Sequence, residues 1–170
     1  MFPRPTDPND AGAAAAEARV WLLVCGERMR EDDGVADAAF EALPADVLAL
    51  VHVEHVGVLS VESLLDVPDG AGIVVADAAA GVAAGAVVRI PLSEVRRDGV
   101  FPSTTHVTPP DEIIAAASAL AGREIGGLFV GVGGAAFGFG DRLSPAVDAA
   151  LAEYVETLSG AIREQAARGS

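Results

Sequence analysis

The feature that most constrains the fold of this chain is a set of continuous apolar runs separated by helix-patterned segments. Residues 20–24, 73–76 and 128–132 are apolar without alternation, which is typical of strands buried on both faces. Apolar residues at helical spacing over 35–43, before Pro44, predict a helix after the first run. The alternation predicts an α/β fold: a three-layer α/β/α sandwich with a largely parallel twisted sheet of about five strands.

Further elements are predicted from local signals. Strands are expected at 47–53 and 86–90, and a Gly-rich loop or hairpin connection at 77–85. Helices are expected at 60–65 with Ser60 as the cap, from a hydroxyl cap at Thr108 to Gly122, and from the Ser144-Pro145 cap toward Arg168.

Size and charge limit the possible functions. The 170 residues suffice for one domain with a sizeable core, so we expect a flexible leader at 1–18 and a single domain at 19–168. The net charge of -14 argues against nucleic acid and anionic membranes as partners. The single cysteine, Cys25, cannot form an internal disulfide, and no segment resembles a signal peptide or spanning helix, so we expect a cytoplasmic protein.

Three residues beyond apolar runs are candidates for a functional site. Asp33 stands at a loop-to-helix junction, Asp77 directly follows the run 73–76, and His106 precedes a predicted helix. Because ligands of open α/β folds bind at the carboxyl ends of the strands, these side chains are expected to converge at one sheet edge. Two carboxylates and one imidazole suit borderline or hard ions such as nickel, zinc or manganese. Helix capping and an ordinary turn are the alternative roles of the two acids.

Other groupings are weaker candidates. His52, Glu54 and His55 form a possible metal cluster, but strand alternation places His55 on the opposite face from the other two. A serine-hydrolase triad with Ser144 lacks a nucleophile elbow. Gly131 to Ala136 matches a loose dinucleotide pattern, but no helix follows directly, so a mobile loop is expected there.

Four segments, in order, resemble motifs of the hydrogenase maturation endopeptidases. The opening segment 24–35 resembles the family's G-x-G-N, spacer, D-[DE]-G motif, and 74–78 with Gly81 and Gly85 resembles its second acidic motif. Residues 104–106 resemble the histidine motif and 140–147 the closing G-x-x-L-S-P segment.

The resemblance implies an endopeptidase that removes a C-terminal extension from the large subunit of a nickel-iron hydrogenase. By this resemblance Asp33, Asp77 and His106 would bind nickel, supplied by the large-subunit precursor, and other divalent metals would be able to occupy the same site. The three would thereby be the catalytic residues, acting through the metal.

Two positions depart from the family pattern. Val24 stands where the family has its first glycine, and Glu27 where it has asparagine. Since a β-branched residue adopts positive φ poorly, we expect the backbone before Asp33 to follow another path. These departures favour one alternative, a non-catalytic metal- or peptide-binding relative. A nucleotide-binding domain resting on 131–140 is a third hypothesis.

Overall fold

The computed structural model describes residues 19–95, 101–102 and 108–168. Its centre is one sheet in which five strands run in the order β2-β1-β3-β6-β4, with the short β5 beside β3. Strands β2 (Val51–Gly57), β1 (Val20–Cys25), β3 (Gly72–Ala80) and β6 (Leu128–Gly133) are mutually parallel. Strand β4 (Val87–Pro91) pairs antiparallel with β6, and β5 (Phe101–Pro102) pairs antiparallel with β3. The predicted α/β class and largely parallel sheet are confirmed.

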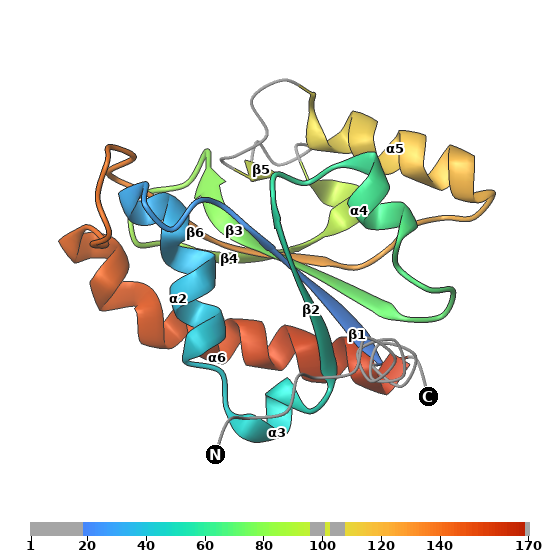
Figure 1. Ribbon diagram of the computed structural model, residues 1–170, viewed down its shortest axis with the longest axis horizontal. Coiled ribbons are helices and arrows are strands. Elements are labelled where there is room, and N and C mark those ends of the chain that lie inside the picture. The colour runs from blue at the N-terminus through green and yellow to red at the C-terminus, as the bar shows by residue number, and fades with distance from the viewer. Residues whose placement is uncertain (1–18, 96–100, 103–107, 169–170) are drawn as a thin grey trace, which may run out of the picture.

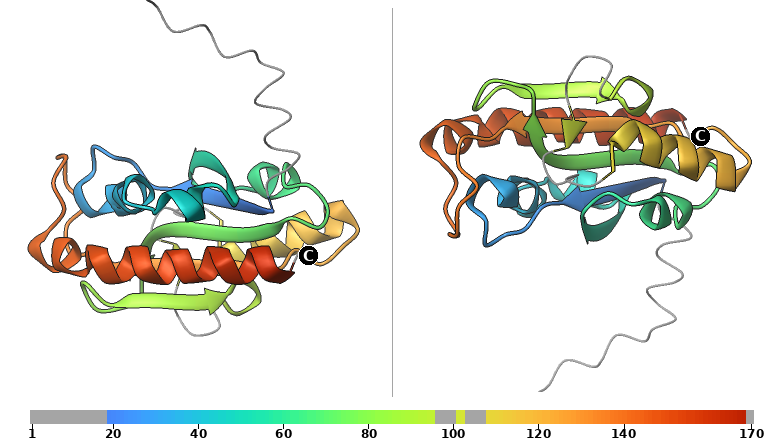
Figure 2. Two further views of the ribbon diagram at one scale, coloured as in Figure 1. Left: turned by 90° about the horizontal axis from the view of Figure 1, so that it is seen from below. Right: turned by 90° about the horizontal axis from the view of Figure 1, so that it is seen from above.

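Helices cover both faces of the sheet (Figures 1 and 2). Helices α2 (Val35–Glu41) and α6 (Pro145–Arg168) pack on one face, over a core that includes Leu22, Val74 and Val130. Helices α4 (Val61–Leu65) and α5 (Pro110–Ala121) cover the other face, over Leu23 and Phe129. The three layers therefore match the sequence prediction.

The first β-loop-α unit forms much as its pattern indicates. Strand β1 is buried at every position, and the polar loop after it leads through the 3-10 helix η1 (Glu31–Gly34) into α2. Helix α4 also follows its signal, because the Ser60 hydroxyl accepts from the Ser63 N–H and the Ser63 side chain accepts in return from the Ser60 N–H. This reciprocal pair satisfies two N–H groups at the start of the helix.

The second strand begins later than predicted. Val47 and Leu48, expected as its start, belong instead to the short helix α3 (Ala45–Leu48), and β2 begins at Val51. The Pro44 carbonyl accepts from the N–H groups of Val47 and Leu48 at 3.0 Å, which closes a helical turn. Short apolar runs do not distinguish helix from strand by periodicity alone, and here the proline-led turn decided the outcome.

Strand β3 is longer than predicted, and this changes the position of Asp77 relative to the end of the strand. The ladder between β3 and β6 continues from Val74 to Ala79, so Asp77 lies inside the strand rather than just beyond it. The loop expected over 77–85 therefore shrinks to the connection between Ala80 and β4. Since β4 pairs with β6 and not with β3, this connection is no hairpin.

The last helices keep their predicted places, but α5 lacks the predicted hydroxyl cap. Helix α5 begins after Pro109 without a side-chain cap, so Thr108 does not cap it, and it ends at Gly122 in the left-handed conformation. Neither the short η2 (Leu92–Glu94) nor any other described helix combines the length and the hydropathy that a membrane span requires. The glycines from Gly131 to Gly133 belong to β6, and α6 begins only at Pro145, which removes the helix terminus that a dinucleotide site needs.

Candidate active site

Asp33 is positioned by a tight loop at the carboxyl end of β1. Gly26 has a φ of +99°, and its N–H donates to the Gly57 carbonyl at 2.7 Å. A Cβ on Gly26 would lie 1.9 Å from the Asp33 carbonyl oxygen, so only glycine lets the two backbones approach this closely. The Glu27 N–H then donates to Asp33 Oδ2 at 3.0 Å. The loop thereby fixes both the backbone and the carboxylate of Asp33.

Neither departure from the family motif has a positive φ at its own position. Val24 is buried within β1, in register with His55 on β2 and Ala76 on β3. Among the described residues other than glycine, only Glu31 has a positive φ, so Val24 keeps an ordinary strand backbone and the expected distortion is absent there. Glu27 contributes its backbone N–H to Asp33, a contact that any residue except proline supplies.

Asp77 lies in the middle layer of the molecule and is fully buried. It stands beside Gly131 in the β3–β6 ladder, and alternation places its side chain on the same face as Val75 and Ala79, the face covered by α4 and α5. On the other face, the Tyr154 hydroxyl of α6 lies 3.2 Å from the Asp77 carbonyl oxygen and 3.1 Å from that of Val130. The backbone carrying Asp77 is thus held by a buried hydroxyl as well as by the sheet.

The two acids share one end of the sheet. The 3-10 helix η1, which contains Asp33, packs against β3, which contains Asp77. Cys25 lies at the end of β1 between them, and burial raises the pKa of its thiol well above the ordinary value, reinforced by the negative charges of Asp77 and Asp33. Cys25 is therefore a protonated, buried thiol at neutral pH and is unsuited to act as a nucleophile.

His106 lies outside the described residues, so its role stays a prediction. Along the chain it precedes α5, the helix that covers the face to which the Asp77 side chain belongs. In the described part of the chain no three His, Cys, Asp or Glu side chains are grouped to hold a metal.

The rival histidine cluster does not form. The His52 ring contacts Trp21 at a centroid distance of 4.3 Å, whereas the His55 ring lies against Phe40 of α2 at 5.3 Å. His55 Nδ1 also lies 2.8 Å from the Asp37 carboxylate. The two histidines therefore face opposite sides of the sheet, as strand alternation predicts.

Asp32 is the important residue that the sequence reasoning missed. Its carboxylate is completely buried and accepts four hydrogen bonds. Oδ2 accepts from the N–H groups of Ala135 and Ala136, at 2.7 and 2.9 Å. Oδ1 accepts from the Ser144 N–H at 2.7 Å, and Oδ2 from the Ser144 hydroxyl at 2.8 Å. Asp32 thereby joins the opening and closing motifs, which are about 110 residues apart in the chain.

The electrostatics of Asp32 follow from these bonds. Burial alone would raise the pKa of its carboxyl, but the N–H donors of Ala135, Ser144 and Ala136 together outweigh burial and lower the pKa below its ordinary value. Asp32 is therefore ionised and structural. The Ser144 hydroxyl donates to Asp32, which rules against its acting as a catalytic nucleophile. Ser144 directly precedes α6, and its carbonyl accepts from the Asp148 N–H at 2.9 Å, so it stands at the helix start where the cap was expected.

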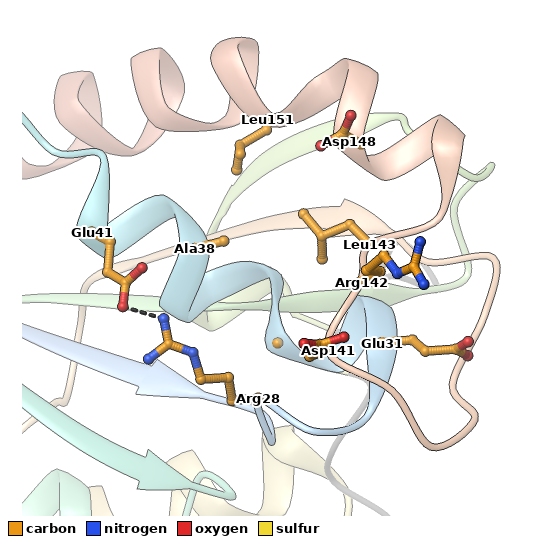
Figure 3. A pocket seen from close by; sticks show the side chains of 10 residues that line it. Arg28, Glu31, Ala38, Glu41, Asp141, Arg142, Leu143, Asp148 and Leu151 are labelled. Atoms are coloured by element: carbon orange, nitrogen blue, oxygen red, sulfur yellow. Dashed lines mark hydrogen bonds and ion pairs between the residues drawn. The ribbon is translucent and has the colours of Figure 1, made fainter.

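A half-open pocket of about 480 Å³ lies between α2 and the first turns of α6 (Figure 3). Figure 3 shows Leu143 and Leu151 between the two helices, and the Arg28–Glu41 ion pair at one side. Four acids and two arginines line the pocket: Glu31, Glu41, Asp141, Asp148, Arg28 and Arg142. It therefore lies on the α2/α6 face, beside the loop that Asp32 anchors.

The solved structures that resemble this chain include hydrogenase maturation proteases. The hydrogenase maturating endopeptidase HybD from Escherichia coli has 21% identity and a TM-score of 0.68, over 86% of this chain and 93% of that chain. The [NiFe] hydrogenase maturation protease HybD from Thermococcus kodakarensis has 22% identity and a TM-score of 0.65, over 84% and 97%. An uncharacterised protein from Wolinella succinogenes has 24% identity and a TM-score of 0.52, over 86% and 95%.

These likenesses define the fold. The chain has the α/β fold of the hydrogenase maturation endopeptidases, and this confirms the structural part of the resemblance found in the sequence. Comparison of the sequence with protein-family models gives no match, and comparison with curated proteins gives none either. The particular activity is therefore argued from the site.

Proposed function

We propose that this chain is an endopeptidase that removes a C-terminal extension from the nickel-loaded large-subunit precursor of a nickel-iron hydrogenase. The observation that carries the proposal is the pair of buried acids, Asp33 and Asp77, brought to one end of a sheet whose fold is that of the hydrogenase maturation endopeptidases. Asp33, Asp77 and His106 would together bind the nickel that the precursor presents.

The donor set fits such an ion. Carboxylate oxygen and imidazole nitrogen are suitable ligands for nickel and other borderline divalent metals, whereas the nearby thiol of Cys25 is held in its protonated form. The position of Asp77 inside a strand gives this ligand a rigid support.

The chemistry follows from the groups that are present. The nickel would polarise the scissile carbonyl or lower the pKa of an attacking water. The protein would orient that ion through two carboxylates, that of Asp33, which accepts from the Glu27 N–H, and that of Asp77, which is carried by strand β3. Cys25 and Ser144 are both unsuited to attack, so water is the proposed nucleophile.

The test is intact-mass analysis of nickel-loaded and nickel-free precursor incubated with the protein. We expect loss of a C-terminal peptide only from the nickel-loaded sample. His106→Ala should abolish processing, whereas the matched control His55→Ala, which removes a half-exposed histidine from the rival cluster, should not. Normal cleavage by His106→Ala would defeat the proposed ligand set.

A second candidate is a non-catalytic relative that binds the precursor or its metal without cleaving it. It is favoured by the replacement of the family's glycine and asparagine by Val24 and Glu27. Binding of nickel-loaded precursor without any change in its mass would support this candidate, and cleavage would exclude it.

A further inference from the structure

An exposed apolar surface lies beside the loop that Asp32 anchors. Phe139 is 91% exposed, and Met29 and Phe137 are 47% and 40% exposed. The Gly140 N–H donates to the Met29 carbonyl at 2.9 Å, so the segments that carry Met29 and Phe139 run side by side. We call these three residues the Phe139 patch. Aromatic side chains left in water on a charged protein are typical of an interaction surface.

The segment behind the patch is held rigidly. The Glu31 carboxylate accepts from the Gly138 N–H at 2.6 Å, and the Glu31 N–H donates to the Gly140 carbonyl at 2.8 Å. Glu31 has a φ of +53°, an unfavourable conformation for a non-glycine residue, which these bonds and those of Asp32 maintain. Hydrogen bonds thus link this loop to η1, and a preorganised surface binds its partner at a lower entropic cost.

The position of the patch connects it to the proposed active site. Met29 lies in the loop between β1 and η1, four residues before Asp33. The loop from β6 to α6, which carries both phenylalanines, extends at the same end of the molecule as η1 (Figure 1). A polypeptide bound with its scissile bond near Asp33 would therefore pass close to the patch.

The charge of the protein indicates which partner the patch fits. The net charge of -14 makes two copies repel each other, which disfavours self-association through this surface. The neighbouring pocket has four acids against two arginines, and Glu31, Asp141 and Arg142 come from the segments that flank the patch. A partner with apolar side chains next to basic residues matches both features.

We propose that the Phe139 patch docks an apolar segment, bordered by basic residues, of the precursor protein on which the active site works. This inference rests on the proposed function, because it takes the precursor as the occupant. Phe139 would insert into an apolar pocket of the precursor, while Asp141 and Asp148 of the adjacent pocket would pair with its basic residues. Docking would place the scissile segment independently of the metal.

The experiment compares Phe139→Ser with Leu120→Ser, a matched control on α5 in which the leucine is 71% exposed. Binding is measured on immobilised nickel-loaded precursor, and cleavage is followed by intact mass with the same proteins. We expect Phe139→Ser to weaken binding by about tenfold or more, as for loss of an aromatic anchor. KM should rise while kcat stays near the wild-type value, and Leu120→Ser should behave as the wild type.

The outcomes separate this inference from the proposed function. Wild-type binding without cleavage, still weakened by Phe139→Ser, would overturn the endopeptidase activity and support the docking surface. Equal binding and KM for Phe139→Ser and the wild type would overturn the docking surface alone. Absence of any wild-type binding would overturn both. A patch that instead mediates self-association would be revealed by sedimentation, with Phe139→Ser changing the oligomeric state and not precursor binding, which also overturns the inference.

Salt dependence tests the basic neighbours of the docked segment. Because ion pairs at a surface are screened by salt, precursor binding should weaken as ionic strength rises. Asp141→Asn removes one exposed pocket carboxylate and should reduce this salt dependence. A binding constant that is insensitive to salt would overturn the basic character assigned to the partner segment.

Discussion

The Asp32 carboxylate accepts two hydrogen bonds from Ser144, one from its N–H at 2.7 Å and one from its hydroxyl at 2.8 Å. Two further N–H groups, those of Ala135 and Ala136, complete the coordination of this buried carboxylate. These four hydrogen bonds link the loop between β6 and α6 to the loop that presents Asp33. The geometry of the proposed active site therefore depends on a residue that does not take part in it.

Replacement of Asp32 by Asn should destabilise the protein by about 1–3 kcal/mol, because an amide NH₂ would face backbone N–H donors that then lose their acceptor. The free energy of unfolding from urea denaturation measures this loss. Asp141→Asn is the control, since it removes a carboxylate from an exposed position of the same loop. Equal stabilities of the two variants would contradict the stabilising role of the Asp32 hydrogen bonds.

The contribution of Asp32 to the free energy of unfolding should depend on pH in the acid range. Hydrogen bonding lowers the pKa of Asp32 below its ordinary value of 3.8, so the folded protein binds this proton less readily than the unfolded chain. The stabilisation is fully present above pH 3.8 and is lost as pH falls through the folded-state pKa. The stability difference between wild type and Asp32→Asn should therefore be constant near neutrality and shrink below about pH 4.

Urea denaturation of both proteins from pH 7 down to pH 3 measures this difference. Asp46→Asn is a control, because Asp46 pairs with Arg163 at the exposed surface, where salt screens the interaction. The effect of Asp46→Asn should fall with added salt, whereas that of Asp32→Asn should persist. A difference for Asp32→Asn that grows on acidification would contradict the assigned pKa direction.

Gly26→Ala tests the tight loop that positions Asp33. The new Cβ would meet the Asp33 carbonyl at 1.9 Å and would also require a φ of +99°. Left-handed strain costs about 1–2 kcal/mol, and the clash adds roughly 1–3 kcal/mol. Gly70→Ala is the matched control, with a φ of +86° and nothing within 4 Å of the added Cβ.

Both glycine variants are compared by thermal unfolding and by precursor cleavage. We expect Gly26→Ala to lose more stability than Gly70→Ala and to lose cleavage activity because Asp33 is displaced. Gly70→Ala should keep full activity at a temperature where it is folded. An active Gly26→Ala enzyme would show that the position of Asp33 tolerates movement.

The sequence predicts the architecture well, because the strands of the sheet centre are continuous apolar runs. Residues 20–24 and 128–132 have no polar alternation and became β1 and β6. The sequence predicts the ends of the strands less well. The start of β2 is delayed because the Pro44 carbonyl accepts hydrogen bonds that form a helical turn before it. The extent of β3 beyond Asp77 depended on pairing with β6, a partner some 50 residues away that local sequence does not reveal.

The sequence selects Asp33 and Asp77 as candidates because one precedes a predicted helix and the other follows an apolar run. The structure brings both to one end of the sheet, although Asp77 lies within β3. It did not reveal Asp32, since an acid next to another acid in a loop gives no local sign that it is buried. Only the fold brings Ser144 and Ala135 to that carboxylate. The resemblance of both segments to motifs of one family was a signal that they contact each other, and the structure supplies the physical reason.

The last prediction concerns Cys25, which lies closest to the two acids along the first strand but takes no part in the proposed chemistry. Burial and the charges of Asp77 and Asp33 raise the pKa of its thiol, so little thiolate exists at neutral pH. Cys25→Ala should therefore cleave the precursor with unchanged kcat/KM, and the native wild-type thiol should resist alkylation until the protein is unfolded in urea. Mass spectrometry after iodoacetamide treatment, with and without urea, measures the second effect. Rapid alkylation of the native protein together with loss of cleavage would show a reactive thiol and would replace the metal-activated water by a cysteine nucleophile.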